Sequence, residues 1–279
     1  MHEPLRRAPG SSRSDPCRIP RRAASLSFRP PALPTFVSRP PSGRVLVVAP
    51  HPDDEMMGPG GALLLHRAAG DPISIVVVCD GSLGDPDGYF EKDGYAARRA
   101  QETRDVAKEF LGTEDVHFFG FVDGITEQDV DKVYPNLPPE PDEKRRVLVN
   151  GLSTHLRGHI QRVRPQVIYF PWVGEFHADH WGTGQAIENL VKNEPELFQD
   201  VSLMGYEVWA TVRPDTLLDI TSVFETKLKA IRCYETQTRY VDYSRVVGGL
   251  NRYRGMLIPG TETRYAEAFM GRYRGVDGT

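Results

Sequence analysis

The sequence predicts an α/β protein built as one domain around a mostly parallel sheet. Two aliphatic runs, 45–49 and 73–79, are typical of strands buried on both faces of such a sheet. A helical segment at 60–67 lies between them, so the three segments form a βαβ unit. With 279 residues, the chain is long enough for one α/β domain with a substantial core.

Turn residues delimit these elements and the ones that follow. Gly58-Pro59 precedes the first helix and Gly70-Asp71-Pro72 ends it, because glycine and proline interrupt helices. Gly112 and Pro165 end two later helices in the same way. In chain order we expect further strands at 116–119, 166–171, 203–212 and 217–220, and further helices at 95–111, 142–164, 182–191, 222–234 and 244–254.

The first 42 residues differ in composition from the rest of the chain. They hold nine of the 23 prolines and eight arginines against two acids, a net charge of +6. They also lack apolar periodicity, so we predict that residues 1–42 form a disordered basic arm and that the folded domain covers 43–279.

The remaining residues carry a net charge of −10, which gives no electrostatic footprint for nucleic acid. The chain has no apolar run of 18 residues, and no short apolar core follows the basic residues as in a signal peptide. The cysteines at 17, 79 and 233 are odd in number and far apart, which argues against a disulfide framework. We therefore expect a cytoplasmic protein without a membrane span, whose oligomeric state, a homo-oligomer included, the sequence leaves open.

Two polar clusters follow two of the predicted strands. His51, Asp53 and Asp54 come directly after the first strand, while His177 and His180 follow the strand at 166–171. Because ligands bind outside the carboxyl ends of parallel strands, we expect the two clusters to meet. Histidine and aspartate are ligands of catalytic zinc sites, which keep one position open for reaction.

The alternative for each cluster is a helix cap. Asp53 or Asp54 could accept amide hydrogen bonds at the start of the next helix, and the histidine loop could do the same for the helix at 182–191. A cap needs only one acid and no histidine. The two clusters together supply three ligands and leave spare acid and base groups, which favours a catalytic site over capping.

The sequence resembles the PIG-L/LmbE-like family of zinc-dependent de-N-acetylases over roughly residues 43–271. The resemblance rests on Ala49-Pro50-His51-Pro52-Asp53-Asp54-Glu55, on His177-Ala178-Asp179-His180 and, more weakly, on the tail from Arg252 to Phe269. It implies a Rossmann-like single domain that removes the acetyl group from an N-acetylhexosamine-containing small molecule or glycoconjugate.

By position, the resemblance implies that His51, Asp54 and His180 are the zinc ligands and that Asp53 is the general base. It also implies that His177 polarises the amide and that Asp179 orients His177. Zn²⁺ is the expected cofactor, although another divalent metal would satisfy the same ligands. Either Asp53 or His177 could protonate the leaving amine, and the sequence does not decide between them.

Three features bear on substrate recognition. Arg99 lies in a segment that resembles the family's Arg-x-x-Glu, which makes it a candidate substrate contact, and Trp172 could stack on a sugar face. Glu175 replaces a tyrosine with which some relatives assist at the oxyanion. The Pro- and acid-rich segment 120–141 is a candidate lid.

Two alternatives to sugar deacetylation remain at the level of sequence. The same metal site could hydrolyse an amide or ester of a non-sugar acyl substrate, since aromatic residues would equally line an apolar pocket. The chain could also be a non-catalytic ligand-binding module, although such a module would not need a spare base beside the ligands.

Overall fold

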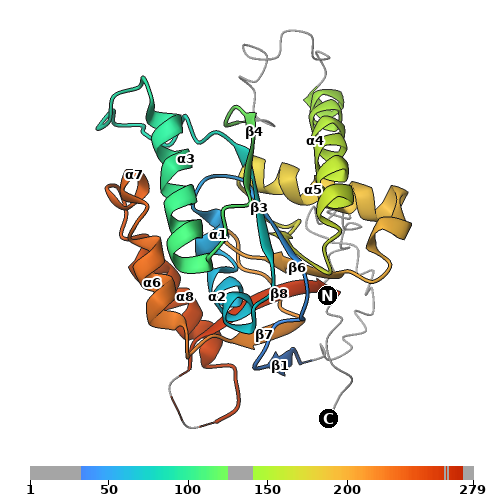
Figure 1. Cartoon of the computed structure of the whole chain (residues 1–279), viewed down its shortest axis with the longest axis vertical. Helices are drawn as coiled ribbons and strands as arrows, with labels where there is room; N and C mark the ends of the chain where they lie inside the picture. Colours follow the sequence, from blue (N-terminus) through green and yellow to red (C-terminus); the bar gives the residue numbers. More distant parts are fainter. Residues whose placement is uncertain (1–32, 125–140, 261, 263, 273–279) are drawn as a thin grey trace, which may run out of the picture. The chain divides into compact units, whose positions relative to one another are not determined.

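The computed structural model describes residues 33–124, 141–260, 262 and 264–272, which form one eight-stranded sheet with helices on both faces (Figure 1). This confirms the predicted α/β class and the mostly parallel sheet. Among the described helices, none combines the length and the apolar character that crossing a bilayer requires.

The strand order is β1-β7-β8-β6-β5-β2-β3-β4, and every neighbouring pair is parallel except those that β8 forms with β6 and β7. The strands are β1 Thr35–Val37, β2 Val45–Ala49, β3 Ile73–Cys79, β4 Val116–Phe121, β5 Val167–Pro171, β6 Ser202–Tyr206, β7 Thr216–Asp219 and β8 Ala266–Arg272.

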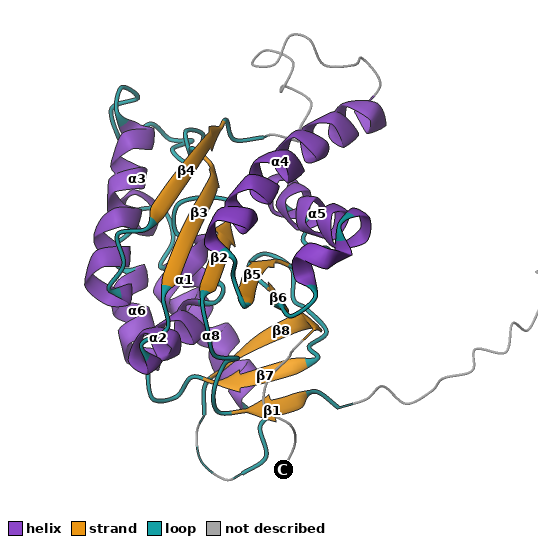
Figure 2. Cartoon of the chain, turned by 45° about the vertical axis from the view of Figure 1, so that its right-hand side comes forward, coloured by secondary structure: helices purple, strands orange, loops and turns teal. Residues whose placement is uncertain are grey.

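Two layers of helices cover the sheet, with α4 and α5 on one face and most of the others on the opposite face (Figure 2). The α-helices are α1 Asp54–Met57, α2 Gly60–Ala69, α3 Tyr95–Val106, α4 Pro141–Val163, α5 Ala178–Asn193, α6 Phe224–Ile231, α7 Glu235–Thr238 and α8 Tyr243–Gly255. A π-helix, η1 Ala107–Leu111, continues α3, and a 3-10 helix, η3 Pro195–Phe198, follows α5.

The aliphatic run of β2 is continuous because both of its faces are buried. Val45, Val47 and Ala49 belong to the core under α1, α2 and α6, while Leu46 and Val48 belong to the core under α4 and α5. All five side chains are fully buried. The pattern that predicted a central strand therefore has its physical cause in the two-sided core.

The order of the strands reverses next to β2. The chain runs from β2 through β3 to β4 in one direction and then returns to β5 on the other side of β2. At such a switch point the connections leave in opposite directions and open a crevice at the carboxyl ends of the strands. The loops that carry the two predicted clusters, after β2 and after β5, both end at this crevice.

Several predicted boundaries need correction. Residues 35–37, which we assigned to the disordered arm, form β1 and pair in parallel with β7. The rest of the predicted arm, 1–32, and most of the predicted lid, 125–140, lie outside the described residues. The helix expected at 182 begins at Ala178, and the strand expected to reach 212 ends at Tyr206.

A buried ion pair connects the C-terminal strand to the elements beside the crevice. The Lys227 ammonium donates to Glu267 Oε1 (2.7 Å) and to the carbonyl oxygens of Met57 and Gly58 (3.1 and 3.0 Å). The Glu267 carboxylate also accepts two backbone N–H groups in the first turn of α2, at 2.5 and 2.8 Å. Because both charges are buried and fully hydrogen-bonded, removal of either partner leaves the other uncompensated.

We predict that Lys227→Met lowers the free energy of unfolding by about 3 kcal/mol, because the Glu267 charge then stays buried without its cation. Urea denaturation at neutral pH measures this change. The matched control is Lys108→Met, which removes an exposed ion pair with Glu114 of similar length, 2.6 Å. Equal losses in the two variants would contradict the role of burial.

Candidate functional site

The loop after β2 has a strained backbone. Asp53 adopts a backbone φ of 119°, a value that residues other than glycine rarely take. Its N–H donates to Glu55 Oε2 (3.0 Å), and the Tyr234 hydroxyl donates to Glu55 Oε1 (2.6 Å). Glu55 is 1% exposed, so it supports the loop from inside the protein. The fixed backbone holds the Asp53 and Asp54 side chains in different directions.

Three side chains converge at the end of β2. His51 Nδ1 and His180 Nε2 lie 3.3 and 3.1 Å from the same Asp54 oxygen, and all three groups offer one ligand atom within 4.8 Å of one another. Both ring nitrogens of His180 are buried: Nδ1 has no hydrogen-bond partner in the described part of the chain, and the one polar contact of Nε2 there is the Asp54 carboxylate. A buried imidazole rarely stays unsatisfied, so this donor set fits a divalent cation with nitrogen and carboxylate ligands.

His51 also belongs to a second group of potential metal ligands, whose other members are Cys79, Asp123 and Asp179. This second group fits a cation less well. Asp123 accepts the N–H groups of Gly81 and Leu83 at 2.8 and 2.9 Å. Burial raises the pKa of the Cys79 thiol well above its usual range, which disfavours the thiolate that binds metals.

Asp179 contacts two of the histidines. Its carboxylate contacts His51 Nε2 at 3.0 Å and accepts the N–H of Gly124 at 2.9 Å, so its side chain orients His51, while its backbone N–H donates to His177 Nδ1 at 3.3 Å. A carboxylate on the second nitrogen of a ligating histidine fixes the ring and its tautomer. The prediction placed Asp179 in a loop, whereas it lies in the first turn of α5.

Carboxylates dominate the electrostatics at His51. Burial lowers the pKa of its imidazole, but hydrogen bonds to Asp179 and Asp54 outweigh this effect and raise the pKa to about 10. For Asp54, burial opposes ionisation, while His180 and His51 hold the pKa well below its usual range. Surroundings that draw a proton onto His51 also favour any other cation, a metal ion included.

His177 precedes α5 and acts as its N-cap. Its Nδ1 accepts the backbone N–H of Asp179 (3.3 Å), which leaves the proton of the neutral ring on Nε2. Burial, together with the neighbouring His51 and His180, lowers the pKa of His177 to about 4. The helix cap that we considered as an alternative for the histidine loop is therefore present at His177, whose side chain also lines the cavity.

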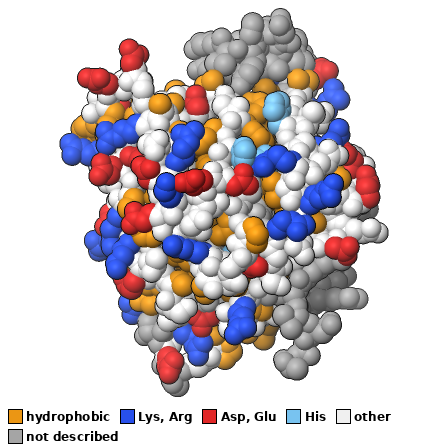
Figure 3. Space-filling model, viewed as in Figure 1, with side chains coloured by type: hydrophobic (Ala, Val, Ile, Leu, Met, Phe, Trp, Pro, Cys, Tyr) orange, Lys and Arg blue, Asp and Glu red, His pale blue; other side chains and the backbone are white. Residues whose placement is uncertain are grey.

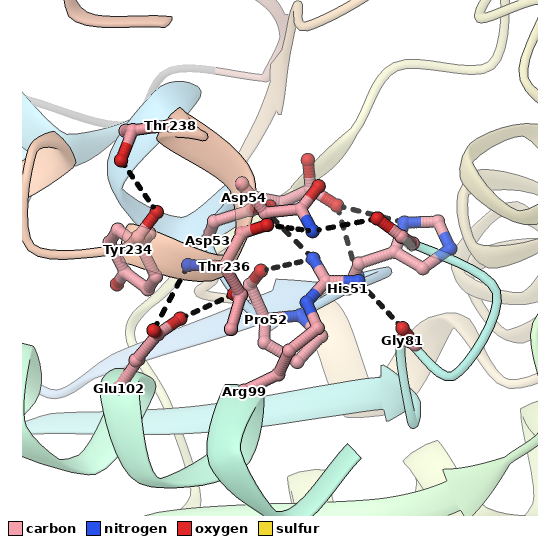
Figure 4. A network of polar contacts seen from close by, with 12 residues as sticks. His51, Pro52, Asp53, Asp54, Gly81, Arg99, Glu102, Tyr234, Thr236 and Thr238 are labelled. Atoms are coloured by element: carbon pink, nitrogen blue, oxygen red, sulfur yellow. Dashed lines mark hydrogen bonds and ion pairs between the residues drawn. The ribbon is translucent and has the colours of Figure 1, made fainter. Parts of the chain in front are cut away.

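Arg99 is a partner of Asp53. Its guanidinium is 3% exposed and donates to Asp53 Oδ2 (3.1 Å), Pro52 O (2.8 Å) and Gly81 O (3.0 Å), as Figure 4 shows. Burial raises the pKa of Asp53 well above its usual range, and the charge of Arg99 opposes that rise. Two of these contacts hold the loop that carries Asp53, and the third reaches Gly81 in the loop after β3. Arg99 also lines the cavity described next, so the substrate contact stays a prediction.

These groups line an open cavity. Its floor is polar and includes His51, Asp53, Asp54, Asp123, His177 and Asp179. Its apolar and aromatic lining comes from Met57, Leu83, Trp209 and Tyr243. Basic and acidic side chains are intermingled over the face of the molecule in Figure 3, with no continuous basic stripe there.

Trp172 is not among the residues that line the cavity. Its ring packs with Val212, Leu217 and Ala268, and its Nε1–H donates to the carbonyl of Ala210 (2.9 Å). The tryptophan that lines the cavity is Trp209 instead. Trp209 could not be recognised as a cavity residue from sequence, because residues 203–212 have the apolar pattern of a strand.

Comparisons with known proteins agree with the fold. The model of the family described as "GlcNAc-PI de-N-acetylase" (PIG-L) matches residues 46–191. The diacetylchitobiose deacetylase of Thermococcus kodakarensis is 29% identical over 207 residues, which cover 70% of each chain. A probable N-acetyl-α-D-glucosaminyl L-malate deacetylase of Bacillus cereus is 30% identical over 70% of this chain and 83% of its own.

Solved structures with the same fold have more than one activity. The N,N′-diacetylchitobiose deacetylase from Pyrococcus horikoshii has a TM-score of 0.62 at 24% identity, covering 82% of this chain and 83% of its own. The 4-carboxy-2-hydroxymuconate hydratase from Pseudomonas putida has a TM-score of 0.62 at 23% identity, with coverages of 85% and 99%. At these identities the likeness establishes the fold alone.

We predict that His180→Ala loses most of the bound metal, because a buried nitrogen ligand is removed, whereas Asp53→Asn retains it. Metal analysis of purified protein after zinc loading and desalting measures the stoichiometry. Wild-type stoichiometry in His180→Ala would show that the cation binds elsewhere. Comparable thermal unfolding of the two variants after metal removal serves as the control for folding.

Proposed function

The chain belongs to the PIG-L family, whose model covers residues 46–191 of its 279, and from this premise we propose that it is a zinc-dependent de-N-acetylase. Its substrate would be a small molecule or glycoconjugate that contains an N-acetylhexosamine. The observation that carries the proposal is the convergence of His51, Asp54 and His180 beside the buried acid Asp53. Deacetylases of N-acetylglucosamine-containing compounds among the relatives support the substrate class.

His51, Asp54 and His180 would hold the zinc ion, and Asp179 would fix the orientation of His51. When bound, zinc supplies a Lewis acid that polarises a carbonyl and lowers the pKa of water. Zinc is favoured over harder cations by the two imidazole ligands.

Asp53 would act as the general base. It lines the cavity, and burial raises the pKa of its carboxyl group well above its usual range, which makes the carboxylate a stronger base. In the reaction a water oxygen adds to the acetyl carbonyl, Asp53 takes a proton from that water, and the carbon–nitrogen bond then breaks. The products are acetate and the free amine.

His177 would stabilise the negative charge that develops on the carbonyl oxygen. Its capping hydrogen bond through Nδ1 leaves Nε2–H as a donor. Because the pKa of His177 is lowered to about 4, the ring is neutral at pH 7 and a poor source of protons. Protonated Asp53 is therefore the better candidate to protonate the leaving amine.

The remaining expectations stay predictions. They are a cytoplasmic location, a domain preceded by a basic arm, the absence of nucleic-acid partners and an oligomeric state that includes homo-oligomers. The alternatives, hydrolysis of a non-sugar acyl substrate and a non-catalytic binding module, are outcomes of the following experiment.

We expect the zinc-loaded protein to release acetate from N,N′-diacetylchitobiose or another N-acetylglucosaminide, and a chelator to abolish the release. Mass spectrometry of the sugar and enzymatic detection of acetate measure the reaction together. Simple N-acetyl amides without a sugar are the comparison substrates, and Asp53→Asn is the inactive control. Faster hydrolysis of the simple amides would favour the acyl alternative, and full activity in the chelator would contradict the proposal.

We predict that Arg99→Lys lowers kcat by about tenfold or more and changes KM little. A lysine cannot keep three hydrogen bonds in the same geometry, so the Asp53 carboxylate loses its fixed position. Steady-state kinetics on the preferred glycoside separates the two constants. If Arg99 were a substrate contact, as the sequence suggested, KM would rise instead.

A further inference from the structure

Trp209 lines the cavity and has no part in the proposed reaction. The following inference rests on the proposed function only for the identity of the substrate. We propose that Trp209, held in place by Glu175, is the platform of a subsite for an uncharged sugar ring.

Trp209 is a half-exposed aromatic side chain at the cavity. It is 45% exposed, and its ring lies nearly parallel to that of His177 at 6.4 Å between centroids, with an angle of 22°. The ring of Tyr243 meets it edge-on at 6.3 Å and 86°. A tryptophan that is left partly in water beside the candidate oxyanion donor can cover the apolar face of a ring attached to the scissile amide.

The backbone under Trp209 is fixed by a buried carboxylate from another loop. Glu175 is 3% exposed and accepts the N–H groups of Val208 (2.7 Å), Trp209 (3.1 Å) and Ala210 (3.1 Å). These donors would otherwise continue the ladder of β6, so Glu175 ends the strand and turns the chain toward the cavity. Glu175 thus supports the loop that carries Trp209.

A second set of contacts fixes the far side of the same segment. Glu207 is buried, accepts Val212 N–H at 2.7 Å and forms an ion pair with Arg254. Arg254 also donates to the carbonyl oxygen of Val212 at 2.7 Å. A loop held at both ends keeps Trp209 in place before a ligand arrives, which reduces the entropic cost of binding.

The charges of the cavity select against anionic substituents. Arg99 is the one Lys or Arg among the described residues that line it, and its contacts go to Asp53 and two carbonyl oxygens. Four carboxyl groups, those of Asp53, Asp54, Asp123 and Asp179, line the same space. Among the described lining residues, Arg99 is thus held by these contacts while the four carboxyl groups disfavour a phosphate or carboxylate on the sugar, so an uncharged glycoside fits best.

Binding tests the platform independently of catalysis. In zinc-loaded protein that carries Asp53→Asn, we expect Trp209→Ala to weaken the binding of methyl N-acetylglucosaminide about tenfold. Trp209→Phe should recover most of the affinity, because a smaller aromatic face remains. Isothermal titration measures both, and Tyr253→Ala, an exposed aromatic outside the cavity lining, is the matched control. Equal affinities of the Trp209→Ala and control proteins would overturn the proposal.

A double-mutant cycle tests the positioning role of Glu175. Glu175→Gln should weaken glycoside binding nearly as much as Trp209→Ala does. The double variant should bind the glycoside little more weakly than either single variant. If the losses add, Glu175 does not act through Trp209 and this part of the proposal fails.

Turnover tests the charge selectivity. The zinc-loaded enzyme with Asp53 intact should deacetylate methyl N-acetylglucosaminide at least tenfold more efficiently than N-acetylglucosamine 1-phosphate of the same anomeric form. Equal or faster reaction of the phosphate would overturn the claim of an uncharged substrate. Absence of acetate release from every glycoside would contradict the proposed function, while the binding measurements would still decide the platform.

Discussion

The structure depends on keeping several carboxyl groups buried close to one another. Asp53, Asp54, Glu55 and Asp179 are each at most 5% exposed. Burying a charge without a partner costs several kcal/mol, so each group must be paired or hydrogen-bonded. Asp54 meets two histidines, Asp53 meets Arg99, Glu55 binds a tyrosine and a backbone N–H, and Asp179 meets His51. A divalent cation would add the one strong positive charge that this arrangement favours.

These pairings connect distant parts of the chain to one crevice. The switch point between β2 and β5 brings His51 and His180 together, while Arg99 reaches the same loop from α3 and Tyr234 from the segment after α6. Glu102, which lies in α3 like Arg99, accepts the backbone N–H and the hydroxyl of Thr236 in α7, as Figure 4 shows. The helices beside the crevice thus stabilise the loop that carries the candidate base.

The central strands, their helices and the two clusters could be predicted because their causes are local. A run buried on both faces is apolar throughout, and polar residues after such strands meet at one edge of the sheet. The contacts of Arg99 could not be predicted, nor could the fact that Trp209 rather than Trp172 lines the cavity, since both depend on side chains far apart in sequence. Residues 203–212 have the apolar pattern of a strand, but Glu175 accepts the N–H groups of Val208, Trp209 and Ala210. The contact between the Asp179 carboxylate and His51 could not be predicted either, because we placed Asp179 in a loop, whereas it lies in the first turn of α5.

The central claim is that His51, Asp54 and His180 form the metal site. A crystal structure of the zinc-loaded protein, with anomalous data collected at the zinc absorption edge, tests it most directly. The account predicts one dominant anomalous peak about 2.0–2.2 Å from His51 Nδ1, an Asp54 oxygen and His180 Nε2. A dominant peak beside His51 Nε2, between Cys79, Asp123 and Asp179, would contradict it.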